Sequence, residues 1–150
     1  MPEPTSPGSP LFDHEKLEVY RLELGFVAWA GELLEEVSGK PTKRTAEVCD
    51  QLDRASLSVL LNTAEANGRR QRPQRAKQFD DARGSATECA ACLDALVAKK
   101  VFSEERVLNG KRTLSQIVRM LHGLVIRFEA DVLKEDEVPY RTENAGPEGQ

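Results

Sequence analysis

Apolar residues recur every three or four positions in four segments of the chain, which is the period of an α-helix. These segments cover about residues 13–37, 42–67, 73–100 and 103–134. No segment of useful length alternates with the two-residue period of a strand. Four long helices with short joints predict an all-α fold, an antiparallel up-down four-helix bundle.

Glycine, proline and serine mark the predicted helix ends. Residues 38–41 end the first helix and Gly68 ends the second, because glycine suits a C-terminal cap. Pro73 suits the first turn of the third helix. Ser103 can cap the fourth, in which Gly110 predicts a kinked or frayed first segment.

In the last three helices the apolar positions form one stripe each, and we expect that stripe to face the core. Its members are Val48, Leu52, Ala55, Val59 and Ala66 in the second helix, Phe79, Ala82, Ala86, Ala90, Leu93, Leu96 and Val97 in the third, and Leu114, Ile117, Leu121, Leu124 and Phe128 in the fourth.

The first helix differs because it carries two apolar stripes, about 200° apart around its axis. One contains Leu17, Tyr20, Leu24, Val27, Gly31 and Leu34, and the other contains Val19, Leu22, Phe26, Trp29, Leu33 and Val37. One stripe faces the core and the other needs a partner such as another subunit. The alternative is one wide core face with some apolar residues left exposed. The pattern does not choose between the stripes. We take the candidate oligomer interface as Val19, Leu22, Phe26, Trp29 and Leu33, with Trp29 as its anchor.

Composition separates two tails from the bundle. Residues 1–10 hold four of the eight prolines and residues 135–150 are acidic and polar, so we expect disordered tails flanking a bundle domain at 11–134. The formal net charge is −4, which argues against a broadly basic nucleic-acid binder. Because the tails carry −5 between them, the bundle segment carries +1.

Targeting and cysteine usage favour a cytoplasmic protein without a membrane partner. Residues 1–10 have no basic start and no apolar run, and no segment approaches the ~18 apolar residues of a membrane span. Cys49, Cys89 and Cys92 are an odd number for a secreted disulfide framework. Cys89 and Cys92 form a C-x-x-C pattern, but in mid-helix and without a zinc-ligand set. We therefore expect buried structural cysteines and no cofactor, and a metal or redox enzyme is the third reading.

A cluster of basic residues lies between residues 69 and 83. It carries a net charge of +4 after Asp80 and Asp81 are counted. Such side chains can contact phosphates. The alternative is a solvated edge that pairs with acidic residues of a neighbouring subunit. The candidate nucleic-acid-binding residues, here called the basic edge, are Arg69, Arg70, Arg72, Arg75, Lys77 and Arg83.

Asn62 and Glu65 share one helix face, and so do Ser85 and Glu88. Paired carboxylates can perform acid–base catalysis, but no nucleophile, metal set or phosphate loop accompanies them. We therefore expect a structural polar network of these four residues, no catalytic residues and no small-molecule substrate. His122 is expected in the core or an interface.

Five stretches together resemble the bacterial four-helix bundle proteins, also called 23S ribosomal RNA intervening-sequence proteins. They are residues 17–20, 51–59, 62–65, 68–70 and 82–85, and Phe79 and Glu88 agree with them. The resemblance covers about residues 14–130. Ala66 departs from the family, which often has glycine there, and the change favours a continuous helix.

The family is also similar to the accessory variability determinant of diversity-generating retroelements. The resemblance implies a homopentameric ring of bundles that binds RNA or a reverse transcriptase. We expect a non-enzymatic oligomer that binds a macromolecule, with RNA as the first candidate, through residues 69–83. The alternative is a protein-only adaptor that docks a partner such as a reverse transcriptase.

Overall fold

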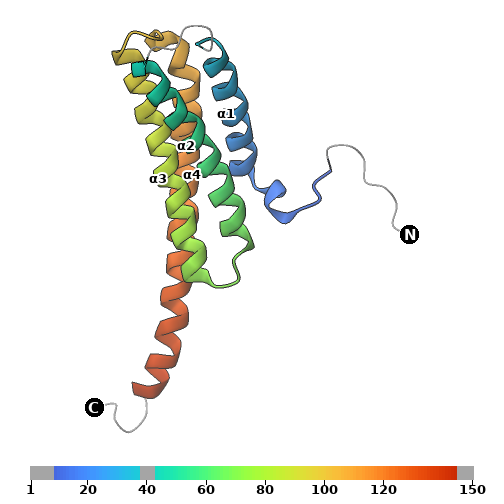
Figure 1. Cartoon of the computed structure of the whole chain (residues 1–150). Helices are drawn as coiled ribbons and strands as arrows, with labels where there is room; N and C mark the ends of the chain where they lie inside the picture. The colour runs from blue at the N-terminus through green and yellow to red at the C-terminus, as the bar shows by residue number, and fades with distance from the viewer. Residues whose placement is uncertain (1–8, 38–42, 145–150) are drawn as a thin grey trace.

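Four α-helices pack against one another in an up-down arrangement in this computed structural model, which describes residues 9–37 and 43–144 (Figure 1). A short 3-10 helix, η1 (Asp13–Lys16), precedes α1 (Glu18–Glu35). It is followed by α2 (Lys43–Gly68), α3 (Arg72–Ala98) and α4 (Glu104–Asn144). The described residues contain no strand, so the prediction of an all-α four-helix fold is confirmed.

The helix ends follow the capping chemistry of the sequence. Pro73 lies in the first turn of α3. The hydroxyl of Ser103 accepts a hydrogen bond from the backbone N–H of Arg106 at 3.1 Å, as predicted for an N-cap. At the end of α3, Lys100 adopts a left-handed φ of 62°, and the N–H of Val101 reaches back to the carbonyl of Leu96 at 2.9 Å.

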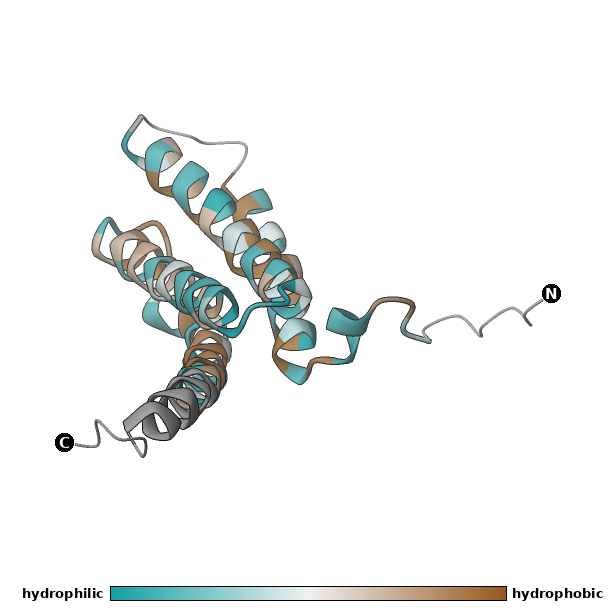
Figure 2. Ribbon diagram, turned by 90° about the horizontal axis from the view of Figure 1, so that it is seen from below, coloured by the Kyte–Doolittle hydropathy of each residue, from teal (hydrophilic) through white to brown (hydrophobic). Residues whose placement is uncertain are grey.

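The core is built from the stripes predicted for the last three helices. Leu52, Phe79, Leu93, Leu114 and Ile117 are all essentially inaccessible to solvent. Figure 2 shows the apolar faces of the helices turned toward one another and the polar faces turned outward. α3 packs along both α2 and α4, whereas the shorter α1 closes the bundle by contacting α2 and α4.

The interface predicted on α1 is wrong, because its central residues lie in the core of their own chain. Val19, Phe26 and Leu33 are 2% exposed or less, and Leu22 and Trp29 pack partly buried against the same core. The other stripe is only partly exposed, because Leu24 faces solvent whereas Leu17 and Leu34 pack partly buried against the core. α1 thus presents one wide core face with some apolar residues left exposed, which is the alternative that the sequence pattern left open.

Trp29 packs against α4 at the position of Gly110. A methyl group at residue 110 would lie 2.3 Å from the Trp29 ring, so only glycine leaves room for this contact. The guanidinium of Arg106 covers the ring from 5.6 Å, and Phe26 contacts it from within α1. Gly110 therefore serves helix packing, and the first segment of α4, predicted to be kinked or frayed, is helical from Glu104 onward.

The last helix is longer than the sequence predicts. α4 continues to Asn144, beyond the boundary at residue 134, and its end extends past the other helices (Figure 1). Residues 135–144 of the predicted acidic tail are therefore helical, whereas the predictions for residues 1–8 and 145–150 lie outside the described part of the chain. Within that part, no helix is both long enough and apolar enough to cross a bilayer.

Candidate nucleic-acid interface

The basic edge begins at the end of α2, crosses the turn to α3 and continues along the first three turns of α3. The structure divides its six residues into two groups. Arg75 is half-buried and Arg69 is exposed, but both bond to α2 or α3 groups of the scaffold, whereas Arg70, Arg72, Lys77 and Arg83 belong to the surface beside α3. The sequence pattern could not make this division, since all six lie in one charge cluster.

Arg75 connects three helices. From α3 it donates hydrogen bonds to the backbone carbonyls of Ala66 and Asn67, at 3.2 and 2.7 Å, where α2 ends. These carbonyls lack partners within their own helix, and a cation there is favourable. The Arg75 guanidinium also lies 4.9 Å from the ring centroid of Phe128 on α4. This arginine is therefore part of the scaffold.

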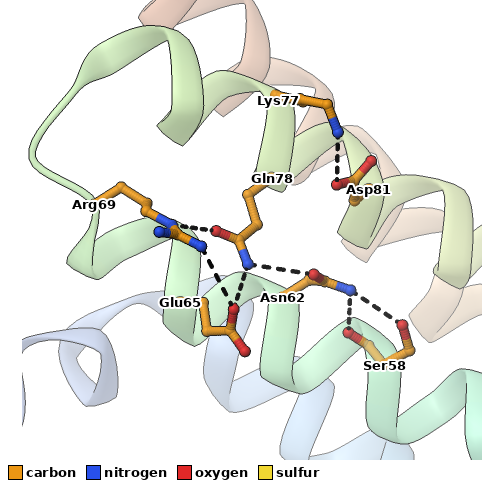
Figure 3. Close-up of polar contacts among 7 residues, drawn as sticks. All are labelled: Ser58, Asn62, Glu65, Arg69, Lys77, Gln78 and Asp81. Atoms are coloured by element: carbon orange, nitrogen blue, oxygen red, sulfur yellow. Dashed lines mark hydrogen bonds and ion pairs between the residues drawn. The ribbon is translucent and has the colours of Figure 1, made fainter.

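Arg69 belongs to a polar network between α2 and α3 (Figure 3). Its Nε donates to the side-chain carbonyl of Gln78 at 2.9 Å, and its guanidinium lies 3.9 Å from the Glu65 carboxylate. The amide nitrogen of Gln78 donates to Glu65 at 2.6 Å and to Asn62 at 3.4 Å. Gln78 is thus the centre of the network.

The contacts continue along the α2–α3 seam. Asn62 donates to the carbonyl and the hydroxyl of Ser58, at 2.9 and 3.0 Å, and Ser58 shares a hydrogen bond of 2.9 Å with Ser85 (Figure 3 shows the Ser58 end). Gln51 donates to Glu88 further along. All four residues predicted from the sequence lie on this seam. Asn62, Glu65 and Ser85 are joined through Ser58 and Gln78, whereas Glu88 pairs separately with Gln51. The sequence did not indicate Gln51, Ser58 or Gln78 as partners.

Lys77 and Arg83 are held by acidic neighbours on the same helix. Lys77 lies 3.4 Å from Asp81, and Arg83 donates two hydrogen bonds to Asp80 at 2.9 and 2.7 Å. All four side chains are at least one-third exposed, so these ion pairs are weak and screened by salt. A phosphate can therefore compete with the carboxylates for both cations.

A groove between α3 and α4 lies beside these residues. It has a volume of about 780 Å³ and is lined by Pro73, Ala76, Lys77, Asp80, Arg83, His122, Val125 and Glu129. Its centre is apolar and its margins are charged. We call it the α3–α4 groove.

His122 lines the α3–α4 groove and is exposed, so of its two predicted places, core or interface, the core is wrong and the interface stays a prediction. Leu121, one position earlier, is fully buried, and the two side chains point about 100° apart around α4. An imidazole at this margin can donate a hydrogen bond to a bound anion. The sequence did contain a signal for this exposure, because residue 122 is not a member of the apolar stripe predicted for the fourth helix.

Arg70 and Arg72 lie on the turn that leads into the α3–α4 groove. Both are exposed, and Pro73, the next residue, already lines the groove. The turn places their charges at the start of α3, so the groove and the turn form one continuous surface. Phe79 is 1% exposed and offers no platform on which a base could stack.

The cysteines do not show the environment of reactive thiols. Cys89 and Cys92 are buried, and burial raises the pKa of Cys89 to about 12. Burial also raises the pKa values of Cys92 and Cys49. A nucleophilic cysteine needs its pKa lowered. In the described part of the chain, no three metal-binding side chains come together.

Glu23 is a buried carboxyl group that the sequence analysis did not identify. It is 1% exposed on the core side of α1, and its Oε2 accepts a hydrogen bond of 2.7 Å from the Thr63 hydroxyl on α2. Its Oε1 has no hydrogen-bond partner within the described residues. Burial raises the pKa of Glu23 to about 8, although the Thr63 bond acts in the opposite direction.

Known proteins were compared with the chain by sequence and by structure. A family model described as 23S rRNA-intervening sequence protein matches residues 15–123. A solved protein of unknown function from the S23 ribosomal protein family of Bacteroides thetaiotaomicron is similar in structure, with a TM-score of 0.66. The similarity covers 71% of this chain and 97% of that chain at 18% identity, and at this identity it shows the fold alone. No curated protein matches the chain.

Proposed function

This chain belongs to the 23S rRNA-intervening sequence protein family, as its resemblance predicted, and we propose that it is a non-enzymatic, oligomeric bundle that binds RNA. The contact surface is the α2–α3 turn together with the α3–α4 groove. One observation carries the proposal: Lys77, Arg83 and His122 line an open groove with Asp80 and Glu129, and the exposed Arg70 and Arg72 beside it make the whole surface positive.

The surface suits phosphates better than bases. Arginine presents a planar fork of N–H donors that matches phosphate oxygens, and three basic residues of this surface, Arg70, Arg72 and Arg83, are arginines. Base readout would need exposed aromatic or shaped polar groups, and Phe79 is buried. Affinity therefore comes from phosphate contacts, with little dependence on base sequence.

A charge-reversal experiment tests the RNA proposal. The double variant Arg70→Glu/Arg72→Glu should lose binding to a single-stranded RNA by at least tenfold at low salt. The matched control is Lys99→Glu/Arg112→Glu, which makes the same charge change at exposed positions by the α3–α4 turn, the opposite end of the bundle (Figure 1). Equal loss in both variants, or no binding by the unmodified protein, contradicts the proposal.

Self-association as a homopentameric ring is the second part of the proposal. Leu24 on α1 and Leu57 and Leu61 on α2 are large apolar side chains that the bundle leaves about half exposed. Helical geometry turns them to the outer side of the adjacent helices α1 and α2. This corrected outer face replaces the buried stripe as the candidate interface. Light scattering should give about 84 kDa, five chains of 16.7 kDa; a single-chain mass contradicts it.

A protein-only adaptor is the second candidate function, in which the ring docks a partner such as a reverse transcriptase. The exposed leucines on α1 and α2 favour this function, because apolar patches of this kind mark protein contacts. The two functions separate in one experiment. An oligomer that ignores RNA even at low salt supports the adaptor and excludes direct RNA binding.

A further inference from the structure

The N-terminal arm, residues 9–16, carries two large apolar side chains that its own fold does not cover. Leu11 is 74% exposed and Phe12 is 65% exposed, the highest values among the large apolar residues of the described chain. The arm leaves the bundle beside α1 and extends away from it (Figures 1 and 2).

Local hydrogen bonds hold this arm in a defined shape. The Glu15 carboxylate accepts hydrogen bonds from the backbone N–H groups of Leu11 and Phe12. The ring of Phe12 stacks on His14 at 5.7 Å, and His14 contacts Tyr20 of α1 at 4.7 Å. The aromatic contacts thus join the arm to the outer face of α1, and the two apolar side chains are presented on an ordered support.

The arm is also fixed to one side of α1. Asn67, at the end of α2, donates a hydrogen bond of 2.9 Å to Asp13 of η1, and η1 packs on α2. Leu17 then adopts an extended backbone conformation between η1 and α1. The arm therefore lies on the α2 side of α1.

The opposite side of α1 holds an apolar groove against α4. It has a volume of about 290 Å³ and is lined by Leu17, Glu18, Val19, Met120, Gly123 and Leu124. Only Glu18 among them is charged, and the space beside Gly123 is open, since nothing lies within 4 Å of a methyl group placed there. We call it the α1–α4 groove. η1 packs on α1 and α2 but not on α4, so the chain's own arm is held away from the α4 side of this groove.

We propose that Leu11 and Phe12 of one copy insert into the α1–α4 groove of a second copy. Two observations favour a second copy as the occupant. The apolar arm and the apolar groove lie on different sides of α1, and the contact of η1 with α2 holds the arm away from the groove of its own chain. Because arm and groove are different surfaces, the contact passes from copy to copy, as a ring requires. The outer face of α1 continues the arm through Tyr20 and enlarges the contact.

This inference rests on the proposed self-association, and light scattering of the full-length protein tests it. Leu11→Ser/Phe12→Ser removes the arm's apolar groups, and Gly123→Leu places a side chain in the groove from a position where a Cβ meets nothing within 4 Å. Each variant should fall to the mass of one chain and keep its thermal unfolding. Leu108→Ser, at another exposed leucine, should remain assembled.

Mixing the two variants is the decisive step. One variant keeps an intact groove and the other keeps an intact arm, so an equimolar mixture should form a species of two chains, twofold the mass of either alone. A mixture that stays at the mass of one chain overturns the inference. If the unmodified protein is an oligomer and both variants also remain assembled, the arm–groove inference is overturned but the proposed self-association stands. If the unmodified protein is a monomer, the inference and the proposed self-association are both contradicted.

Discussion

Glu23 carries the one carboxyl group buried in the core of the described bundle. Its raised pKa of about 8, against an ordinary value of 4.5, means that the folded protein keeps the carboxyl protonated at neutral pH. The unfolded chain releases this proton at lower pH. Stability from this group is therefore complete below pH 4.5 and decreases as the pH rises toward 8.

Glu23→Gln should remove this pH dependence, because an amide does not ionise in this range. At pH 7 the difference corresponds to about 3 kcal/mol of unfolding free energy as an upper bound. Urea unfolding between pH 4.5 and 8 measures it, with the exposed Glu18→Gln as the matched control on the same helix. Parallel pH profiles for Glu23→Gln and the unmodified protein would refute the account of a neutral buried carboxyl.

Replacement of the buried Gln78 should lower the stability of the fold, because its side-chain amide bonds to three other side chains. Gln78→Ala leaves Asn62, Glu65 and Arg69 without this partner and should lower stability by about 1–3 kcal/mol. This corresponds to a decrease of several degrees in melting temperature. Gln116→Ala, at an exposed position of α4, should change it little. Equal melting temperatures would show that the network contributes nothing to stability.

At the scale of the helices, hydrophobic periodicity predicted α2, α3 and α4 together with their core faces. It failed on α1 because both stripes have helical spacing. The buried face of α1 also contains Glu23. A carboxyl group argues against burial of a helix face, and the sequence does not show that this one is protonated and bonded to Thr63. Gln78 gave no sequence signal either, since its role depends on residues that only the fold brings together.

Gly110 gives a second test at this scale. In an open helix, glycine to alanine stabilises by up to about 1 kcal/mol. At residue 110 the added methyl group would meet the Trp29 ring at 2.3 Å, so Gly110→Ala should instead destabilise by about 1–3 kcal/mol. Gly25→Ala, where nothing lies within 4 Å, should be neutral or stabilising in the same thermal unfolding measurement. A stabilising Gly110→Ala would contradict the described contact between α1 and α4.

At the scale of the whole molecule, the basic edge and the apolar surfaces occupy different places. The RNA surface lies at the α2–α3 turn and in the α3–α4 groove, whereas Leu24, Leu57 and Leu61 lie on α1 and α2 and the α1–α4 groove has a separate set of lining residues. The proposed self-association and the proposed RNA contact therefore use different residues. Repetition of one weak surface around a ring raises its avidity when a single RNA spans several copies.

The same arrangement explains how a chain of net charge −4 can bind a polyanion. The sequence located the charge cluster, but it could not show that Arg75 and Arg69 are engaged by the scaffold. Four basic residues and His122 remain at the surface, and they are placed around one groove and one turn. Binding depends on this local concentration of charge and not on the charge of the whole protein.

The most direct measurement of the central claim is the salt dependence of RNA binding. Fluorescence anisotropy of a labelled single-stranded RNA should give an affinity that falls steeply with salt, since each neutralised phosphate contributes about −0.7 to the slope of log K against log salt. Four surface cations per chain predict a slope of about −3 for each engaged subunit, and Arg70→Glu/Arg72→Glu should reduce it. Absence of binding at low salt, or an affinity that does not change with salt, would contradict the account.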